Sequence, residues 1–119
     1  FLVIGVSHAW ADINEQECTE WKEIEKQITE DLPKKIDEAT ELTNFMINCD
    51  TKVIKYSKRL LFDTKLLKGD WKNRKQRQHS NLHCNKQGIA STIKWTVLDD
   101  LYDKDFEYLT TFITRPNDC

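Results

Sequence analysis

The sequence predicts an α+β fold: a four-stranded antiparallel sheet with helices on one face, in the order α-β-β-α-β-β, with two disulfides. Three observations lead to this prediction. A helical apolar pattern comes first, two regions of alternating apolar and polar residues follow, and four cysteines are spread over the 119 residues. The chain is 39% hydrophobic and 32% charged, which is typical of a globular protein rather than a disordered one.

A helix is predicted over residues 14–32. Its apolar positions recur at intervals of three and four residues and form one stripe: Cys18, Trp21, Ile24, Ile28 and Leu32. Pro33 ends the helix, because proline cannot donate the next helical hydrogen bond.

Two strands are predicted over residues 42–62. The segments 42–48 and 53–62 are rich in β-branched and aromatic residues, and Cys49-Asp50-Thr51 supplies a turn between them. One side of the second segment is apolar except at Lys58, and its other side is polar. This alternation is typical of a sheet with one solvated face.

A hairpin is predicted over residues 92–114, with its turn at Asp103-Lys104-Asp105. Apolar and polar residues alternate through it except at Asp99, which breaks the alternation and predicts a bulge. Residues 64–90, between the two strand regions, are ambiguous. Trp71 suits the start of a helix, Gly69 weakens it, and residues 72–79 contain no apolar side chain. We expect an exposed helix or a loop there.

The cysteines indicate an oxidising compartment, because an even number in a short chain is typical of a disulfide framework. Four cysteines allow three pairings. We favour Cys84–Cys119, which would fix the C-terminal tail beside the last strand, and Cys18–Cys49, which would join the first helix to the first strand pair. The crossed pairings remain open.

Residues 1–11 are interpreted as the end of a secretory signal peptide, because an apolar run is followed by the small-residue pattern Ala9-Trp10-Ala11. An N-terminal strand or a short buried segment is the alternative. Residues 12–119 would then form a single secreted or periplasmic domain. No other apolar run approaches the roughly 20 residues needed to cross a bilayer, so no transmembrane segment is expected.

Two blocks of the sequence resemble a family of small exported bacterial proteins of uncharacterised function. The first contains Leu32-Pro33, Ile36-Asp37, Thr40, Leu42 and the strand segment 53–60, and the second contains Cys84, Tyr102-Asp103-Lys104-Asp105 and Asp118-Cys119. The resemblance covers about residues 30–119 but not the basic stretch 65–79, and it implies a fold without known chemistry. Asp105 stands where the family has a turn glycine, and aspartate tolerates the left-handed conformation of such a turn.

The net charge of −2 combines segments of opposite sign. Residues 12–50 hold twelve acidic and four basic side chains, whereas residues 51–86 hold eleven basic and two acidic ones. We expect these segments to lie close together and to neutralise each other. Alternatively, the basic segment forms a binding face for an anionic partner. The candidate binding residues are Lys65, Lys68, Trp71, Lys72, Arg74, Lys75 and Arg77.

We expect a non-catalytic binding protein, such as an inhibitor or accessory factor of another secreted or envelope protein. Another protein would bind one sheet face or residues 65–79, and an exported location disfavours nucleic acid. One alternative is binding of a polyanion or a membrane surface through residues 65–79. The other is a small hydrolase or metal-dependent protein that uses His79 and His83, which share one helix face at this spacing.

No catalytic residue, metal ligand or cofactor is predicted. The sequence has only three glycines, so it lacks a phosphate-binding glycine-rich loop, and it has no G-x-S-x-G motif. Cys84 cannot serve as a nucleophile or metal ligand beside the histidines if it is oxidised, because both roles require the thiolate. The oligomeric state is not predicted.

Overall fold

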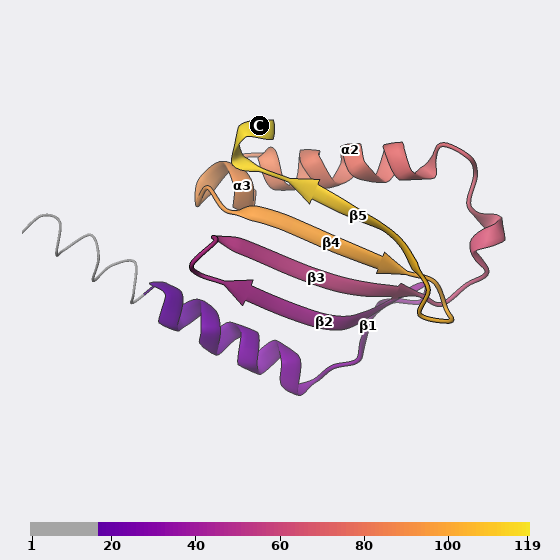
Figure 1. The fold of residues 1–119 in the computed structure, drawn as a ribbon, viewed down its shortest axis with the longest axis horizontal. Coiled ribbons are helices and arrows are strands. Elements are labelled where there is room, and N and C mark those ends of the chain that lie inside the picture. Colours follow the sequence, from indigo (N-terminus) through magenta and orange to yellow (C-terminus); the bar gives the residue numbers. More distant parts are fainter. Residues whose placement is uncertain (1–16) are drawn as a thin grey trace, which may run out of the picture.

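The computed structural model describes residues 17–119, in which a five-stranded sheet is flanked by helices (Figure 1). The strands are β1 (Lys34–Asp37), β2 (Thr40–Asn48), β3 (Val53–Leu60), β4 (Thr96–Tyr102) and β5 (Tyr108–Thr114). The helices are residues 17–30, α2 (Trp71–Cys84) and the short α3 (Ile89–Thr92), with 3-10 turns at Thr64–Leu66 and Pro116–Asp118. The signal-peptide interpretation of residues 1–11 falls outside the described residues.

The strands lie side by side in their sequence order, β1-β2-β3-β4-β5. Neighbours are antiparallel except β3 and β4, which run parallel. The α+β class is therefore confirmed, but the prediction of four antiparallel strands is wrong. The connection from β3 to β4 contains α2, and a crossover of this length can return the chain in the same direction. β1 was missed because all four of its side chains are exposed and no apolar alternation marks it.

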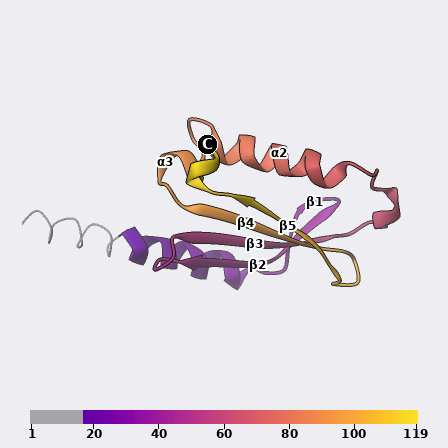
Figure 2. The same ribbon diagram turned by 45° about the horizontal axis from the view of Figure 1, so that its top comes forward.

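The helices pack on one face of the sheet, as predicted. Pairing places Ile54 opposite Val97, so these two side chains point to the same face. On this face Trp21, from the first helix, packs in a core cluster with Ile54, and Trp71 of α2 packs against Phe112 of β5. The first helix lies toward the β2 edge and α2 toward the β5 edge, as a second view also shows (Figure 2).

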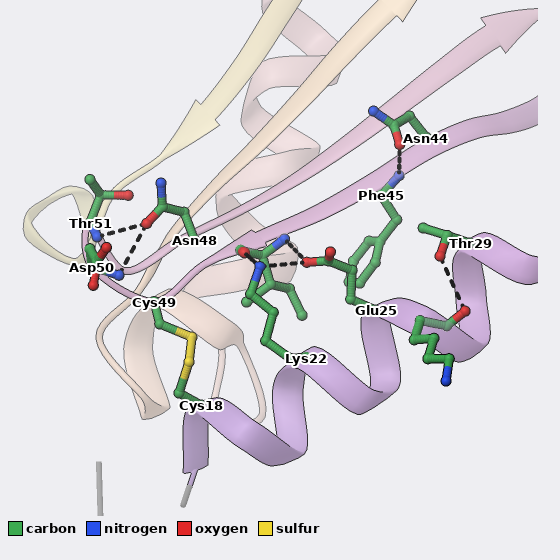
Figure 3. Close-up of polar contacts among 12 residues, drawn as sticks. Cys18, Lys22, Glu25, Thr29, Asn44, Phe45, Asn48, Cys49, Asp50 and Thr51 are labelled. Atoms are coloured by element: carbon green, nitrogen blue, oxygen red, sulfur yellow. Dashed lines mark hydrogen bonds and ion pairs between the residues drawn. A yellow bond between two sulfur atoms is a disulfide. The ribbon is translucent and has the colours of Figure 1, made fainter. Parts of the chain in front are cut away.

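Side chains of the two helices bind the backbone of β5, an outer strand, and of the part of β2 that extends past its pairing with β1. On β5, the Gln76 amide donates to the Ile113 carbonyl (2.8 Å) and accepts from the Ile113 N–H (3.0 Å). On β2, Glu25 accepts from the Ile47 N–H (2.6 Å) and Lys22 donates to the Ile47 carbonyl (2.5 Å; Figure 3). These side chains occupy the positions where another strand would bond, which protects the edges against pairing with a second chain.

Both disulfides tie a helix to another part of the domain. Cys18–Cys49 joins the first helix to the turn after β2 (Figure 3), and Cys84–Cys119 joins the end of α2 to the last residue. This is the pairing favoured from the sequence, and it agrees with an oxidising compartment. No helix within residues 17–119 is both long and apolar enough to cross a membrane.

The turn between β4 and β5 is held by Asp103. Its Oδ1 atom accepts hydrogen bonds from the N–H groups of Asp105 and Glu107. The left-handed residue of the turn is Phe106, with φ of 63°, and the Arg59 guanidinium lies 4.5 Å from the centre of its ring. The expectation that Asp105 takes the role of the turn glycine is therefore wrong, because the left-handed position falls one residue later.

Candidate functional site

An ion pair is buried on the helix-covered face of the sheet. The Lys58 ammonium of β3 lies 2.9 Å from the carboxylate of Asp99 on β4, and Asp99 is only 8% exposed. Both residues interrupt an apolar pattern in the sequence, and the structure brings the two interruptions together. The predicted bulge at Asp99 is wrong, because the β3–β4 register continues through it and the β4–β5 irregularity falls between Leu101 and Tyr102.

Two histidines of α2 accompany this ion pair. The rings of His79 and His83 are 4.6 Å apart between centroids, and both residues are buried. The Nδ1 atom of His79 lies 2.7 Å from the Thr114 hydroxyl on β5. Burial, together with the nearby His83 and Lys58, lowers the pKa of His79 to about 4, so its ring is neutral at neutral pH. Burial also lowers the pKa of His83, although Asp99 opposes this effect.

Some polar atoms of this cluster lack partners. His79 Nε2 and Asp99 Oδ1 are buried and make no hydrogen bond with the part of the chain that the structure describes. Burial raises the pKa of Asp99, while Lys58 acts in the opposite direction. The pKa of Tyr56, which pairs with Asp99 across the strands, is raised by burial and then by the Asp99 charge. Buried polar atoms without partners are rare in native proteins and call for an explanation.

A cavity of about 260 Å³ opens on the same face of the sheet, between α2 and β1. Its floor comes from the central strands and β5: Lys58, Leu60, Asp99, Leu101 and Phe112. Lys75, Gln78, His79 and Leu82 of α2 form one wall, and the segment around β1 forms the other. Ile36 of β1 and Leu82 of α2 are apolar side chains that remain 53% and 61% exposed.

The predicted binding segment is divided among different surroundings. Trp71 packs in the core, with its ring 6.4 Å from that of Phe112, so it does not form part of an open binding face. Lys75 lines the cavity. The other basic side chains are exposed, and we call them the basic outer surface: Lys65, Lys68, Lys72, Arg74 and Arg77. None of these five forms an ion pair with any residue of the described range 17–119.

Acidic and basic helices lie at opposite edges of the sheet. The helix of residues 17–30, which lies in the acidic segment, runs beside β2, whereas α2 lies beside β5 (Figures 1 and 2). Within residues 17–119, the ion pairs are confined to the first helix or join neighbouring strands. Arg59 of the basic segment pairs with Glu41 of the acidic segment at 3.1 Å, so the two segments neutralise each other in part, between β2 and β3, whereas their helices lie at opposite edges.

His79 and His83 lie together on α2, with Thr114 beside His79. Among residues 17–119, no three or more His, Cys, Asp or Glu side chains are grouped so that they could hold a metal ion. The Thr114 hydroxyl beside His79 belongs to a residue with no exposed surface, so a substrate does not reach it. Cys84 is bonded to Cys119. The contact between His79 and Thr114 joins α2 to β5.

Sequence reasoning missed the cavity and most of its lining. Gln78 and Leu82 lie on α2, Ile36 lies on β1, and nothing in the local sequence relates these positions to one another. One signal was present: Lys58 and Asp99 each place a charge on an otherwise apolar strand side. Opposite charges at such positions on two strands predict a buried pair, since an isolated buried charge is strongly unfavourable.

No protein-family model matches the chain, and no curated protein matches it. Among solved structures, the chain is similar to the crystal structure of a "putative secreted protein" from Pseudomonas aeruginosa. The TM-score is 0.62 at 8% sequence identity, and the similarity covers 85% of this chain and 90% of that chain. At this identity the similarity shows a shared fold.

Proposed function

We propose that this protein is a non-catalytic, exported binding protein that recognises an acidic face of another protein through the basic outer surface. The observation that carries the proposal is that all five basic side chains of this surface are exposed and lack ion pairs within residues 17–119. Such a concentration of positive charge attracts an anionic surface and speeds association. An inhibitor or accessory factor of a secreted or envelope protein would act in this way.

Two observations support an exported location. Both disulfides link helices that flank the sheet, and disulfides persist in oxidising compartments such as the periplasm or the extracellular space. The fold is also similar to that of the Pseudomonas "putative secreted protein". Proteins in these compartments meet other proteins, glycans and membrane surfaces more often than nucleic acid.

An acidic protein fits the basic outer surface better than the other anionic partners. Nucleobases and sugar rings bind well where aromatic side chains are free to stack on them. Trp71 is not free in this way, because it packs against Phe112. A membrane-surface helix needs a broad apolar side. Within residues 65–77, Leu66 is the one large apolar side chain that is strongly exposed. Amide side chains such as Asn73 lie between the basic side chains and suit a polar protein surface.

Binding of a labelled polyglutamate peptide, followed by fluorescence anisotropy, tests the proposal. The variant K68Q/R74Q/R77Q removes three charges from the basic outer surface. The matched control K34Q/K52Q/K104Q removes three exposed charges from other parts of the molecule. Because an exposed charge contact contributes roughly 0.5 kcal/mol, we expect the first variant to bind about tenfold more weakly. The control should bind almost as well as the wild type.

The same two variants separate the proposal from its alternatives. Equal weakening in both would mean that net charge rather than the basic outer surface governs binding, which would contradict the proposal. Heparin and phosphatidylserine vesicles serve as competing anions. Tight binding to either one, with no measurable binding to polyglutamate, would favour a polyanion or membrane-surface binder instead.

A further inference from the structure

The cavity between α2 and β1 has no part in the function proposed above, yet it combines the groups that recognition of a small molecule requires. We propose that it binds a neutral, hydroxylated molecule of about the size of a single sugar ring. Its volume of about 260 Å³ suits a compact ligand, since pockets for larger organic molecules begin at roughly 300 Å³. This proposal is independent of binding at the basic outer surface.

The charges that line the cavity balance each other. Lys58 and Lys75 are matched by Asp37 and Asp99, and the buried His79 is neutral at neutral pH. Lys58 and Asp99 are already joined at 2.9 Å. A charged ligand would therefore lose its hydration without meeting an excess of opposite charge, which favours a neutral ligand.

The lining offers both donors and acceptors of hydrogen bonds. The Lys58 ammonium donates to Asp99 and has two further N–H groups. The Gln78 amide is exposed on the α2 wall and makes no hydrogen bond with the described residues. Asp99 Oδ1 is a buried acceptor without a partner. A hydroxyl group both donates and accepts, so several hydroxyls on one ring match this mixed lining.

The unpartnered atom of His79 is an acceptor as well. The Thr114 hydroxyl donates to Ser80 Oγ (3.4 Å), so its oxygen is available to accept from Nδ1–H of His79 at 2.7 Å. With the ring proton on Nδ1, Nε2 keeps its lone pair for a donor. Nε2 and Asp99 Oδ1 have almost no contact with solvent. Both atoms belong to residues that line the cavity, so a ligand hydroxyl that satisfies them would remove two unpaired buried acceptors.

Apolar side chains complete the site. Leu60, Leu101 and Phe112 contribute to its floor, and the C–H face of a sugar ring packs well on such a surface. Ile36 and Leu82 stand on opposite walls and are 53% and 61% exposed. A ring held between them would cover two large apolar side chains that the protein leaves in contact with water.

NMR titration of the ¹⁵N-labelled protein with glucose, galactose and mannose tests the proposal. Glucuronate and glucosamine serve as charged probes on the same ring. We expect at least one neutral hexose to shift the amide signals of Lys75, Gln78, Leu101 and Phe112, and to bind more tightly than both charged probes. Q78A should weaken its binding by about fivefold, because a hydrogen bond is lost. N81A, which changes an exposed amide on the same helix away from the cavity, should leave binding unchanged.

Three results would overturn the assignment. The first is the absence of shifts at the cavity residues with all three neutral hexoses. The second is tighter binding of glucuronate or glucosamine than of any neutral hexose. The third is equal affinity in Q78A and wild type, since Gln78 is an exposed amide whose replacement leaves the core intact.

Discussion

At the scale of single residues, Lys58 and Asp99 depend on each other. Their side chains are 28% and 11% exposed, and they lie on the face of the sheet that the helices cover. Burial alone would drive the Asp99 carboxyl toward its neutral form, and Lys58 counteracts this effect through its charge and its hydrogen bond. Removal of one partner therefore leaves an uncompensated charge, whereas replacement of both leaves an apolar surface.

Substitution of this pair by apolar residues tests that dependence. We expect K58M alone to lower the free energy of unfolding by about 3 kcal/mol, because Asp99 would lose its cation. The double variant K58M/D99L should be more stable than K58M. Urea unfolding of the two single variants, the double variant and the wild type measures the coupling. Additive losses would show that the two residues act independently.

Stability should fall in mild acid because of His79. Its pKa is 6.5 in an unfolded chain and about 4 in the folded protein, so the unfolded chain takes up a proton first as the pH falls. The stability associated with the neutral ring is complete above pH 6.5 and is lost as the pH falls toward 4, with a total of about 3 kcal/mol. His83 acts in the same direction.

Asp99 has the opposite effect on the pH dependence. Its pKa is raised above 3.8 in the folded protein, so its protonation favours the folded state as the pH falls through that range. H79Q removes the titrating ring, so the free energy of unfolding, measured with urea between pH 7 and pH 4, should fall less in H79Q than in the wild type. Identical pH profiles for both proteins would contradict the role assigned to His79.

At the scale of elements, helix side chains protect the β5 edge and the part of β2 that β1 leaves unpaired. Gln76 binds both backbone groups of Ile113 on β5, and Glu25 and Lys22 together bind those of Ile47 on β2. Edge strands with free backbone groups are templates for association with other chains. The position of each helix therefore contributes to solubility as well as to the core.

Replacement of Gln76 tests this role. Q76M keeps the length of the side chain but removes both bonds to Ile113, so we expect a loss of about 1–3 kcal/mol in the free energy of unfolding. We also expect self-association at the exposed β5 edge, measured by analytical ultracentrifugation. Q78M is the control, because Gln78 lies on the same helix without bonding a strand. A monomeric Q76M with wild-type stability would contradict the edge-protecting role.

The elements that sequence reasoning found are those whose pattern is local. The alternation of apolar and polar residues predicted β2, β3, β4 and β5, and Pro33 predicted the end of the first helix. Each of these signals lies within a few residues of sequence. The parallel pairing of β3 with β4 was missed, since strand direction depends on the path of the whole α2 crossover. β1 carries too few apolar residues to produce a pattern.

In the candidate site too, the features that depend on nearby residues were predicted and those that depend on distant residues were missed. The basic residues of 65–77 were recognised because they are adjacent in the sequence. Their separation from the acidic helix was not predicted, because it depends on where the sheet places the two helices. The cavity was missed because Ile36, Lys58, Gln78 and Phe112 come from four different elements.

At the scale of the whole molecule, the fold holds an acidic helix and a basic helix apart. The first helix and α2 flank the sheet at opposite edges (Figure 1), and each is fastened by its own disulfide. A net charge of only −2 thus includes an acidic helix at one edge of the sheet and a basic helix at the other. Net charge alone would suggest a weakly charged protein, whereas the arrangement favours oriented approach to a charged partner.

The most direct test of this account is affinity capture from the secreted proteins of the organism that makes the protein, followed by mass spectrometry. The wild type, K68Q/R74Q/R77Q and K34Q/K52Q/K104Q are compared at equal loading, so the two variants have the same net charge. We expect an acidic partner that is captured by the wild type and by the K34Q/K52Q/K104Q control and is lost with K68Q/R74Q/R77Q. Retention of that partner by all three proteins, or its equal loss from both variants, would contradict recognition through the basic outer surface.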